Sequence, residues 1–278
     1  MSPLQPYIVH NISNIIYRFS LFIEPKWVNR PFWENYLKRY HRILAKSTLP
    51  QSPEQLFGSL FNDVQLGHVF ADSKTFVDCT PKGDPADVVD QYQKQKDEPD
   101  FDLSAFVRAY FNLPEKVADK YVSDRSISTT EHINRLWDHL THEADGPPIV
   151  GSSRIPLPNP YVIPGGRFRE IFYWDTYFTM LGLKEAGRVH LIREMLDNFA
   201  FLIDQFGFIP NGNRTYFLSR SQPPYFALMV GLLAEVEGPE IWTTYKPQLL
   251  QEHAFWMHGQ EQLSDETPMC SRVAKVAG

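Results

Sequence analysis

The chain is poor in cysteine and has no excess of basic residues. Its two cysteines among 278 residues cannot build the disulfide framework that staples small secreted domains. The net charge is −6, from 27 basic and 33 acidic side chains, whereas a surface that binds phosphate needs to be basic. These scarcities argue against a disulfide-stapled protein and against a nucleic-acid or anionic-membrane partner.

Long apolar runs are also missing. The chain has no stretch of about 18 or more apolar residues, so we expect no transmembrane helix. Its most apolar N-terminal segment, residues 7–23, is interrupted by polar side chains. That segment also lacks the basic start and the small-residue cleavage site of a signal peptide. We therefore expect a cytoplasmic chain with no membrane partner.

Helix signals are abundant by comparison. Ser52 is followed by Pro53 and Gln55, and Ser128 is followed by Glu131, which are the patterns of capped helix starts. Apolar residues then recur at three- and four-residue spacing, and strand patterns are short and weak. The predicted helices begin near residues 53, 85 and 129, and further helices are predicted at 174–186, 189–206, 223–235 and 240–259. The sequence therefore predicts a mainly α protein.

Two polar connections separate these helices. Residues 143–170 contain six prolines and four glycines, and residues 207–224 are dense in Asn, Arg, Ser and Gln. A long connection without secondary structure inside a compact domain is usually either functional or disordered. Because the first connection leads directly into an unusual aromatic and charged segment, we interpret it as functional.

That segment, residues 164–177, reads PGGRFREIFYWDTY and mixes charges with aromatic rings. Arg167, Glu170 and Asp175 offer directed hydrogen bonds of the kind that hydroxyl groups accept or donate. The ring of Trp174 is suited to cover the C–H patches of a flat, polar ligand such as a sugar. The alternative interpretation is a structural salt-bridge network beside a capped helix.

A second polar cluster lies in the later connection. Its members are Asn211, Asn213, Arg214, Arg220, Ser221 and Gln222. The alternative interpretation is a simple turn at residues 210–212, whose Pro-Asn-Gly composition is common in turns. A turn explains Asn211 but leaves residues 220–222 unexplained.

Other polar residues carry weaker signals. His139 and His142 are three apart and are interpreted as residues on the surface of a helix, because two ligands do not make a zinc site. We therefore predict no metal site. The acids between positions 60 and 90 are interpreted mostly as helix caps and solvated faces: Asp63, Asp72, Asp78 and Asp84.

The stretch PGGRFREIFYWDTYFTMLGL closely resembles the signature of the trehalases, glycoside hydrolase family 37. Other segments are similar to the same family: FNDVQLGHVFADSKTFVDCTPKGDP, FDLSAFVRAYFNLP, HINRLWDHLTHE, IPNGNRTYFLSRSQPP and HAFWMHGQE. The resemblance covers about residues 52–277 and, around Cys79, is strongest to the cytoplasmic bacterial members. Residues 51–278 are therefore predicted to be the N-terminal part of a catalytic domain, and residues 1–50 an unmatched extension, helical or poorly ordered.

The resemblance implies a partial (α/α)6 toroid, truncated at its C-terminal side. It also implies hydrolysis of α,α-trehalose to two glucose molecules with inversion, without a metal or other cofactor, by a protein that is a monomer when complete. The substrate-binding residues that it implies are Arg167, Trp174, Asp175, Asn211, Arg220, Ser221 and Gln222.

The chemistry itself is expected elsewhere. An inverting glycosidase needs one carboxylic group as acid and another as base, and the resemblance implies that both follow Gly278. This chain is then expected to supply only part of the substrate site. The alternative is a catalytically inactive remnant, either a pseudogene product or a sugar-binding fragment.

Overall fold

The computed structural model describes residues 50–114, 121–267, 269–270 and 273–274. Thr48–Gly278 forms one compact unit. The predicted N-terminal extension, residues 1–50, lies outside the described residues except for Pro50, so its helical or poorly ordered character stays a prediction.

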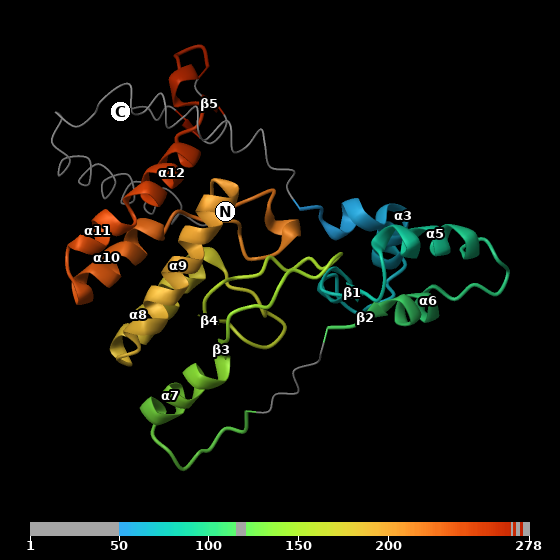
Figure 1. Ribbon diagram of the computed structural model, residues 1–278, viewed down its shortest axis with the longest axis horizontal. Coiled ribbons are helices and arrows are strands. Elements are labelled where there is room, and N and C mark those ends of the chain that lie inside the picture. Colours follow the sequence, from blue (N-terminus) through green and yellow to red (C-terminus); the bar gives the residue numbers. More distant parts are fainter. Residues whose placement is uncertain (1–49, 115–120, 268, 271–272, 275–278) are drawn as a thin grey trace. The chain divides into compact units, whose positions relative to one another are not determined.

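The described part of the chain is mainly α-helical (Figure 1), which confirms the predicted class. Its helices are α3 (Pro53–Leu66), α4 (Lys74–Val77), α5 (Pro85–Gln95), α6 (Leu103–Tyr110), α7 (Thr129–Leu140), α8 (Tyr173–Glu185), α9 (Val189–Phe206), α10 (Phe226–Glu237), α11 (Glu240–Thr244) and α12 (Lys246–Trp256). Two 3₁₀ turns, η2 and η3, span Thr215–Phe217 and Gln260–Gln262.

Short antiparallel strand pairs connect parts of the loops. They are β1 (Thr80–Pro81) with β2 (Phe111–Asn112), β3 (Thr141–His142) with β4 (Tyr161–Val162), and β5 (Met269–Cys270) with β6 (Val273–Ala274). Each strand has two residues, which agrees with the weak strand patterns of the sequence. The β3–β4 pair anchors the long proline-rich connection against the end of α7.

The predicted helix starts are capped by the expected side chains. At α3 the hydroxyl of Ser52 accepts from the N–H of Gln55, and the Gln55 side chain accepts from the N–H of Ser52. Asp84 caps α5 through its carboxylate. Ser128 accepts from the N–H of Glu131 at 3.2 Å, so its hydroxyl caps the start of α7. These local hydrogen bonds satisfy N–H groups that a helix start leaves unpaired.

Helices α3 to α6 share an aromatic core. The ring of Phe111 lies edge-on to Phe57 and Phe76, with centroids 5.1 and 5.2 Å apart. Tyr92 and Phe106 bring α5 and α6 into the same cluster, at 5.6 Å. All five side chains are buried. Burial of these rings therefore holds helices α3 to α6 together.

Helices α8, α9 and α10 form the second packed group. Each of the three contacts the other two, and α11 and α12 pack beside them on α10 and α9. Side chains buried completely between these helices include Tyr173, Met180, Leu183, Ile192, Met195, Phe226 and Val230. This packing of consecutive helices against each other agrees with the expected partial (α/α)6 toroid.

One helix prediction was wrong in its extent. Residues 240–259 form two helices, α11 and α12, instead of one. Pro247 stands in the first turn of α12, where it offers no N–H and its ring would collide with the carbonyl four residues earlier in a continuous helix. The chain therefore restarts at Lys246.

Candidate functional site

The two polar connections meet at the N-terminal end of α8. The N–H of Tyr173 donates to the carbonyl of Asn211 at 3.2 Å, and Phe172 forms an isolated β-bridge with Gly212. The N–H of Asn211 donates in turn to the carbonyl of Arg220 at 3.1 Å. Segments that the sequence analysis singled out separately therefore lie side by side.

Gln222 links the two segments through its side chain. Its Oε1 accepts from the N–H of Trp174 at 3.1 Å, and its Nε2 donates to Oδ2 of Asp175 at 3.2 Å. The N-cap residue of α8, Phe172, supplies no side-chain hydrogen bond to the helix start. The side chain of Gln222, from the 207–224 connection, caps the helix instead. Asp175 in the first turn also complements the positive end of the helix dipole. Three predicted binding residues are thus held in contact.

Aromatic rings surround this polar group. The half-buried ring of Trp174 lies edge-on to Phe178 and Tyr225, with centroids 6.1 and 5.9 Å apart. Phe178 is 53% exposed, so part of its ring faces solvent beside Trp174. The start of α8 therefore presents ring surface beside hydrogen-bonding groups.

The two predicted arginines lie at the ends of a row of phenylalanine rings. The guanidinium of Arg167 is 5.0 Å from the ring centroid of Phe168, and that of Arg220 is 4.8 Å from Phe217. Phe172 lies between them, with centroids 5.7 Å from Phe168 and 5.8 Å from Phe217. Both arginines are exposed, so contact with the rings orients their charged groups without burying them.

Ser221 and Asn211 complete the predicted set. The hydroxyl of Ser221 donates to the carbonyl of Ile209 at 2.6 Å, a contact that shapes its own loop. Asn211 is half-buried and is held through its backbone. The seven predicted residues therefore gather around the N-terminal end of α8, while their role in binding stays a prediction.

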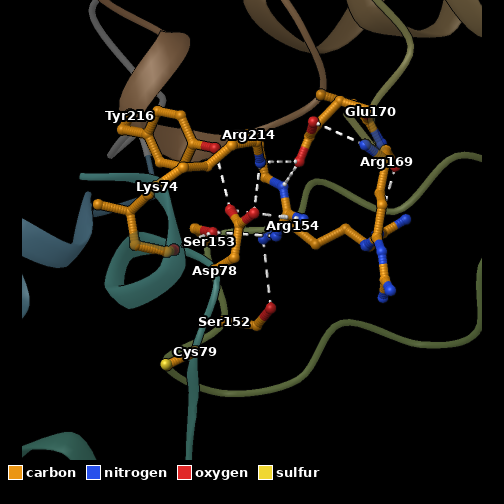
Figure 2. A network of polar contacts seen from close by, with 12 residues as sticks. Lys74, Asp78, Cys79, Ser152, Ser153, Arg154, Arg169, Glu170, Arg214 and Tyr216 are labelled. Atoms are coloured by element: carbon orange, nitrogen blue, oxygen red, sulfur yellow. Dashed lines mark hydrogen bonds and ion pairs between the residues drawn. The ribbon is translucent and has the colours of Figure 1, made fainter. Parts of the chain in front are cut away.

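A buried ion network lies in the same two connections, centred on Glu170 (Figure 2). Glu170 is fully buried, and its Oε1 accepts from Nζ of Lys74 and from Nε of Arg214, both at 2.8 Å. Its Oε2 accepts from the N–H of Arg169 at 3.0 Å. Burial by itself would raise the pKa of Glu170, but the charges of Arg214 and Lys74 hold this pKa below its usual range. Glu170 is therefore an anion at neutral pH.

Asp78 is the second carboxylate of this network (Figure 2). It pairs with Lys74, lies 3.5 Å from Nη2 of Arg214, and accepts from the hydroxyl of Tyr216 at 3.0 Å. Nη1 of Arg214 donates to the hydroxyl of Ser153 at 3.1 Å. The interpretation of these acids mostly as caps and solvated faces does not hold for Asp78, because its side chain is buried and also pairs with Arg214 and Tyr216, far along the chain.

Arg154 extends the network toward the β3–β4 pair. Its Nη1 donates to the hydroxyl of Tyr161 at 2.7 Å and lies 3.3 Å from Oδ1 of Asp145, while its Nη2 donates to the carbonyl of Arg169 at 3.4 Å. Burial raises the pKa of Tyr161 to about 12. Sequence reasoning did not select Arg154, since an isolated arginine in a proline-rich loop carries no spacing signal.

The interpretation of Glu170 and Arg214 therefore changes. Both were grouped with possible ligand-binding residues, yet their charged groups are buried and paired with each other. The alternative of a structural salt-bridge network holds for these two residues. It does not extend to Arg167, Asp175 and Arg220, which are exposed.

The histidine interpretation is corrected in part. His139 lies on α7, but His142 lies on β3, where its ring stacks on Tyr161 with centroids 5.6 Å apart. Among the residues that the structure describes, no group of three or more His, Cys, Asp or Glu side chains is placed to hold a metal ion. No described helix is both long enough and apolar enough to span a bilayer.

Exposed charged side chains and aromatic rings therefore gather at the start of α8 and on the adjacent loops of a helical protein. The chain belongs to the trehalase family, because the family model described as Trehalase matches residues 68–276. The periplasmic trehalases of Escherichia coli O45:K1 and O17:K52:H18 are each 51% identical to it over 217 residues. These matches cover 78% of this chain and 38% of each relative, so the chain spans well under half of their length.

The chain is also similar to solved structures. One of them is the neutral trehalase of Saccharomyces cerevisiae, with a TM-score of 0.36 and 24% sequence identity, covering 84% of this chain and 42% of that one. The family assignment rests on the sequence matches.

The expectation of a cytoplasmic chain, with its strongest resemblance to cytoplasmic members, was wrong. The relatives that are 51% identical are named periplasmic trehalases, which points to the periplasm. The error has a physical reason. Compartment is set by a leader that is removed from the mature protein, whereas residues such as Cys79 belong to the folded domain and are under the same packing constraints in either compartment.

Proposed function

We propose that this chain supplies the N-terminal part of the substrate site of an α,α-trehalase, an inverting glycosidase that hydrolyses trehalose to two glucose molecules. One observation carries the proposal. Gln222 binds both the backbone of Trp174 and the carboxylate of Asp175, so the start of α8 and the 207–224 connection form one surface. Membership of the trehalase family supports trehalose as the ligand.

The chemistry of this surface fits a sugar. Arg167, Asp175 and Arg220 are exposed and carry charged donors or acceptors, which make strong hydrogen bonds to hydroxyl groups. Trp174 and Phe178 supply ring surface next to them. A pyranose presents hydroxyls at its edge and C–H groups on its faces, so it would use both kinds of group at once.

The described carboxylates of this surface do not provide the catalytic pair in our proposal. Glu170 is buried and its pKa is lowered, so it holds no proton to donate at neutral pH. Asp175 is engaged by Gln222 and is assigned to binding. An inverting enzyme needs an acid and a base roughly 6.5–9.5 Å apart with a water between them, and we place that pair on other residues of the enzyme.

Replacing Arg167 tests the proposal. In the enzyme that contains this chain, Arg167→Ala should reduce kcat/KM for trehalose by roughly 10- to 100-fold, because losing a charged hydrogen-bond partner costs about 1.5–3 kcal/mol. Glucose release under initial-rate conditions measures the effect.

Arg135→Ala is the matched control. Arg135 is also an exposed arginine, but it pairs with Glu131 on α7 and lies outside the site. This control should leave kcat/KM unchanged, and both variants should keep the thermal midpoint of the native protein. Near-normal activity in Arg167→Ala would contradict the binding assignment, and absence of trehalose hydrolysis by the native enzyme would contradict the proposed function.

A further inference from the structure

We propose that Glu170 is a positioning residue that holds the two site connections in register without touching the substrate. This inference rests on the proposed function of the surface. Glu170 lies three residues after Arg167, and its partner Arg214 lies three residues after Asn211. Fixing the Glu170–Arg214 contact therefore fixes the spacing between the two segments that carry these predicted binding residues.

Glu170 satisfies three donors from three separate parts of the chain. They are Nζ of Lys74 on α4, Nε of Arg214 and the N–H of Arg169. Both carboxylate oxygens are used as acceptors, two donors on one and one on the other. A glutamine has the same shape but places an N–H₂ group at one of these positions, so it must face at least one of the donors with another donor. Only a carboxylate serves all three.

The network is also balanced in charge. Lys74 and Arg214 contribute two positive charges, and Asp78 and Glu170 contribute two negative ones. The side chains of Arg214, Asp78 and Glu170 are 5%, 7% and 0% exposed. Removing the charge of Glu170 alone leaves a buried excess of one positive charge, which a low-dielectric interior strongly disfavours. The two positive groups are then driven apart, and with them the segments that they belong to.

A second substitution separates the effect of the lost acceptor at Glu170 from the effect of its lost charge. Glu170→Gln removes both the charge and one acceptor, whereas Lys74→Met/Glu170→Gln restores the charge balance and leaves the acceptor deficit. Glu170→Asp keeps the charge and both acceptors on a shorter stem. Tyr245→Phe is the matched control, because it removes a partly buried hydrogen bond to Asp197 on α9, away from the network.

The measurements are hydrogen exchange of residues 165–173 and 210–222, followed by mass spectrometry, and the KM and kcat for trehalose. Glu170→Gln should raise exchange at least tenfold in both segments and raise KM at least tenfold with a smaller change in kcat. The double variant should recover part of the thermal stability but keep fast exchange and high KM. Glu170→Asp should bring the exchange rates and KM part of the way back to the native values. Tyr245→Phe should change neither the exchange rates nor KM.

Two results would overturn the proposal: faster exchange in one segment only, or full recovery of exchange and KM in the double variant. If Glu170→Gln alone does not fold, the double variant decides by the same criteria. The exchange comparison needs no ligand. Failure of the native protein to act on trehalose would therefore overturn the proposed function, while the exchange data would still decide whether Glu170 couples the two segments.

Discussion

The pKa values of two buried glutamates in this protein are shifted in opposite directions, because their neighbours differ. Glu170 faces Lys74 and Arg214, and its pKa lies below the usual range. Burial raises the pKa of Glu252 to about 7, and its hydrogen bond from the hydroxyl of Tyr173 only partly offsets this effect. Burial without a cation favours the neutral form, whereas burial with two cations favours the ion.

The first prediction concerns Glu252. Its pKa is about 7 in the folded protein and near 4.5 in the unfolded chain, so folding favours the protonated form. Its contribution to stability is complete below the unfolded pKa and is lost as the pH rises through 7. Glu252→Gln removes this titration. The free energy of unfolding of the native protein should therefore fall relative to the variant, by up to about 3 kcal/mol between pH 5 and pH 8.

Urea denaturation of both proteins at several pH values measures this difference. The amide of the substituted side chain retains a carbonyl that can accept from Tyr173, whose hydroxyl also accepts from the N–H groups of Tyr225 and Phe226 at the start of α10. The connection to α10 therefore survives the substitution. Parallel stability curves for the two proteins would show that Glu252 does not titrate in this range.

At the scale of elements, the ring of Trp137 on α7 packs against the backbone of α8 because Gly182 has no side chain. A Cβ built at Gly182 would lie 2.8 Å from the ring of Trp137, closer than van der Waals contact allows. The glycine lies in the last turn of α8, where it costs conformational entropy. Close packing of a tryptophan ring on the helix backbone offsets that cost.

Gly182→Ala should therefore destabilise the protein. Replacing a helical glycine by alanine normally stabilises by about 0.5–1 kcal/mol, but overpacking costs about 1–3 kcal/mol, so we expect a net loss of about 1 kcal/mol. Chemical denaturation measures it. Gly231→Ala on α10 is the comparison, because its Cβ would lie 3.2 Å from Trp242 and needs a smaller shift. A more stable Gly182→Ala would mean that Trp137 moves away freely.

At the scale of the whole molecule, helices α3 to α6 have a buried apolar cluster of their own, and polar contacts tie them to the rest of the described chain. The contacts are Lys74 with Glu170, Asp78 with Tyr216, and the hydroxyl of Ser153 donating to the carbonyl of Val77 at 2.6 Å. They link α4 to both site connections. Buried polar contacts of this kind lose their partners together when one side opens.

We therefore expect Thr48–Gly278 to unfold in a single cooperative step. Hydrogen exchange measured at increasing urea concentrations should give α5 and α9 the same free energy of global opening. Lys74→Met should give α5 a lower free energy of opening than α9. Lys184→Met, which removes an exposed ion pair with Glu235, should leave the two values equal. Separate transitions in the native protein would contradict this expectation.

The helices and the two polar connections could be predicted from the sequence alone because their signals are local. Ser52, Asp84 and Ser128 cap the helix starts that their neighbours indicate, and the 189–206 helix begins and ends at the predicted residues. The resemblance to the trehalases also predicted the family. These features depend on residues a few positions apart or on motifs that stay contiguous.

The division of the polar residues into an exposed surface and a buried network depended on the tertiary structure. Lys74 and Arg214 are 96 and 44 residues from Glu170 along the chain, and Tyr216 is 138 residues from Asp78. No local spacing records such pairings, so Asp78 was misread as a solvated acid and Glu170 as a possible ligand-binding group. Burial and charge pairing are properties of the folded chain, because folding brings distant residues together and removes them from water.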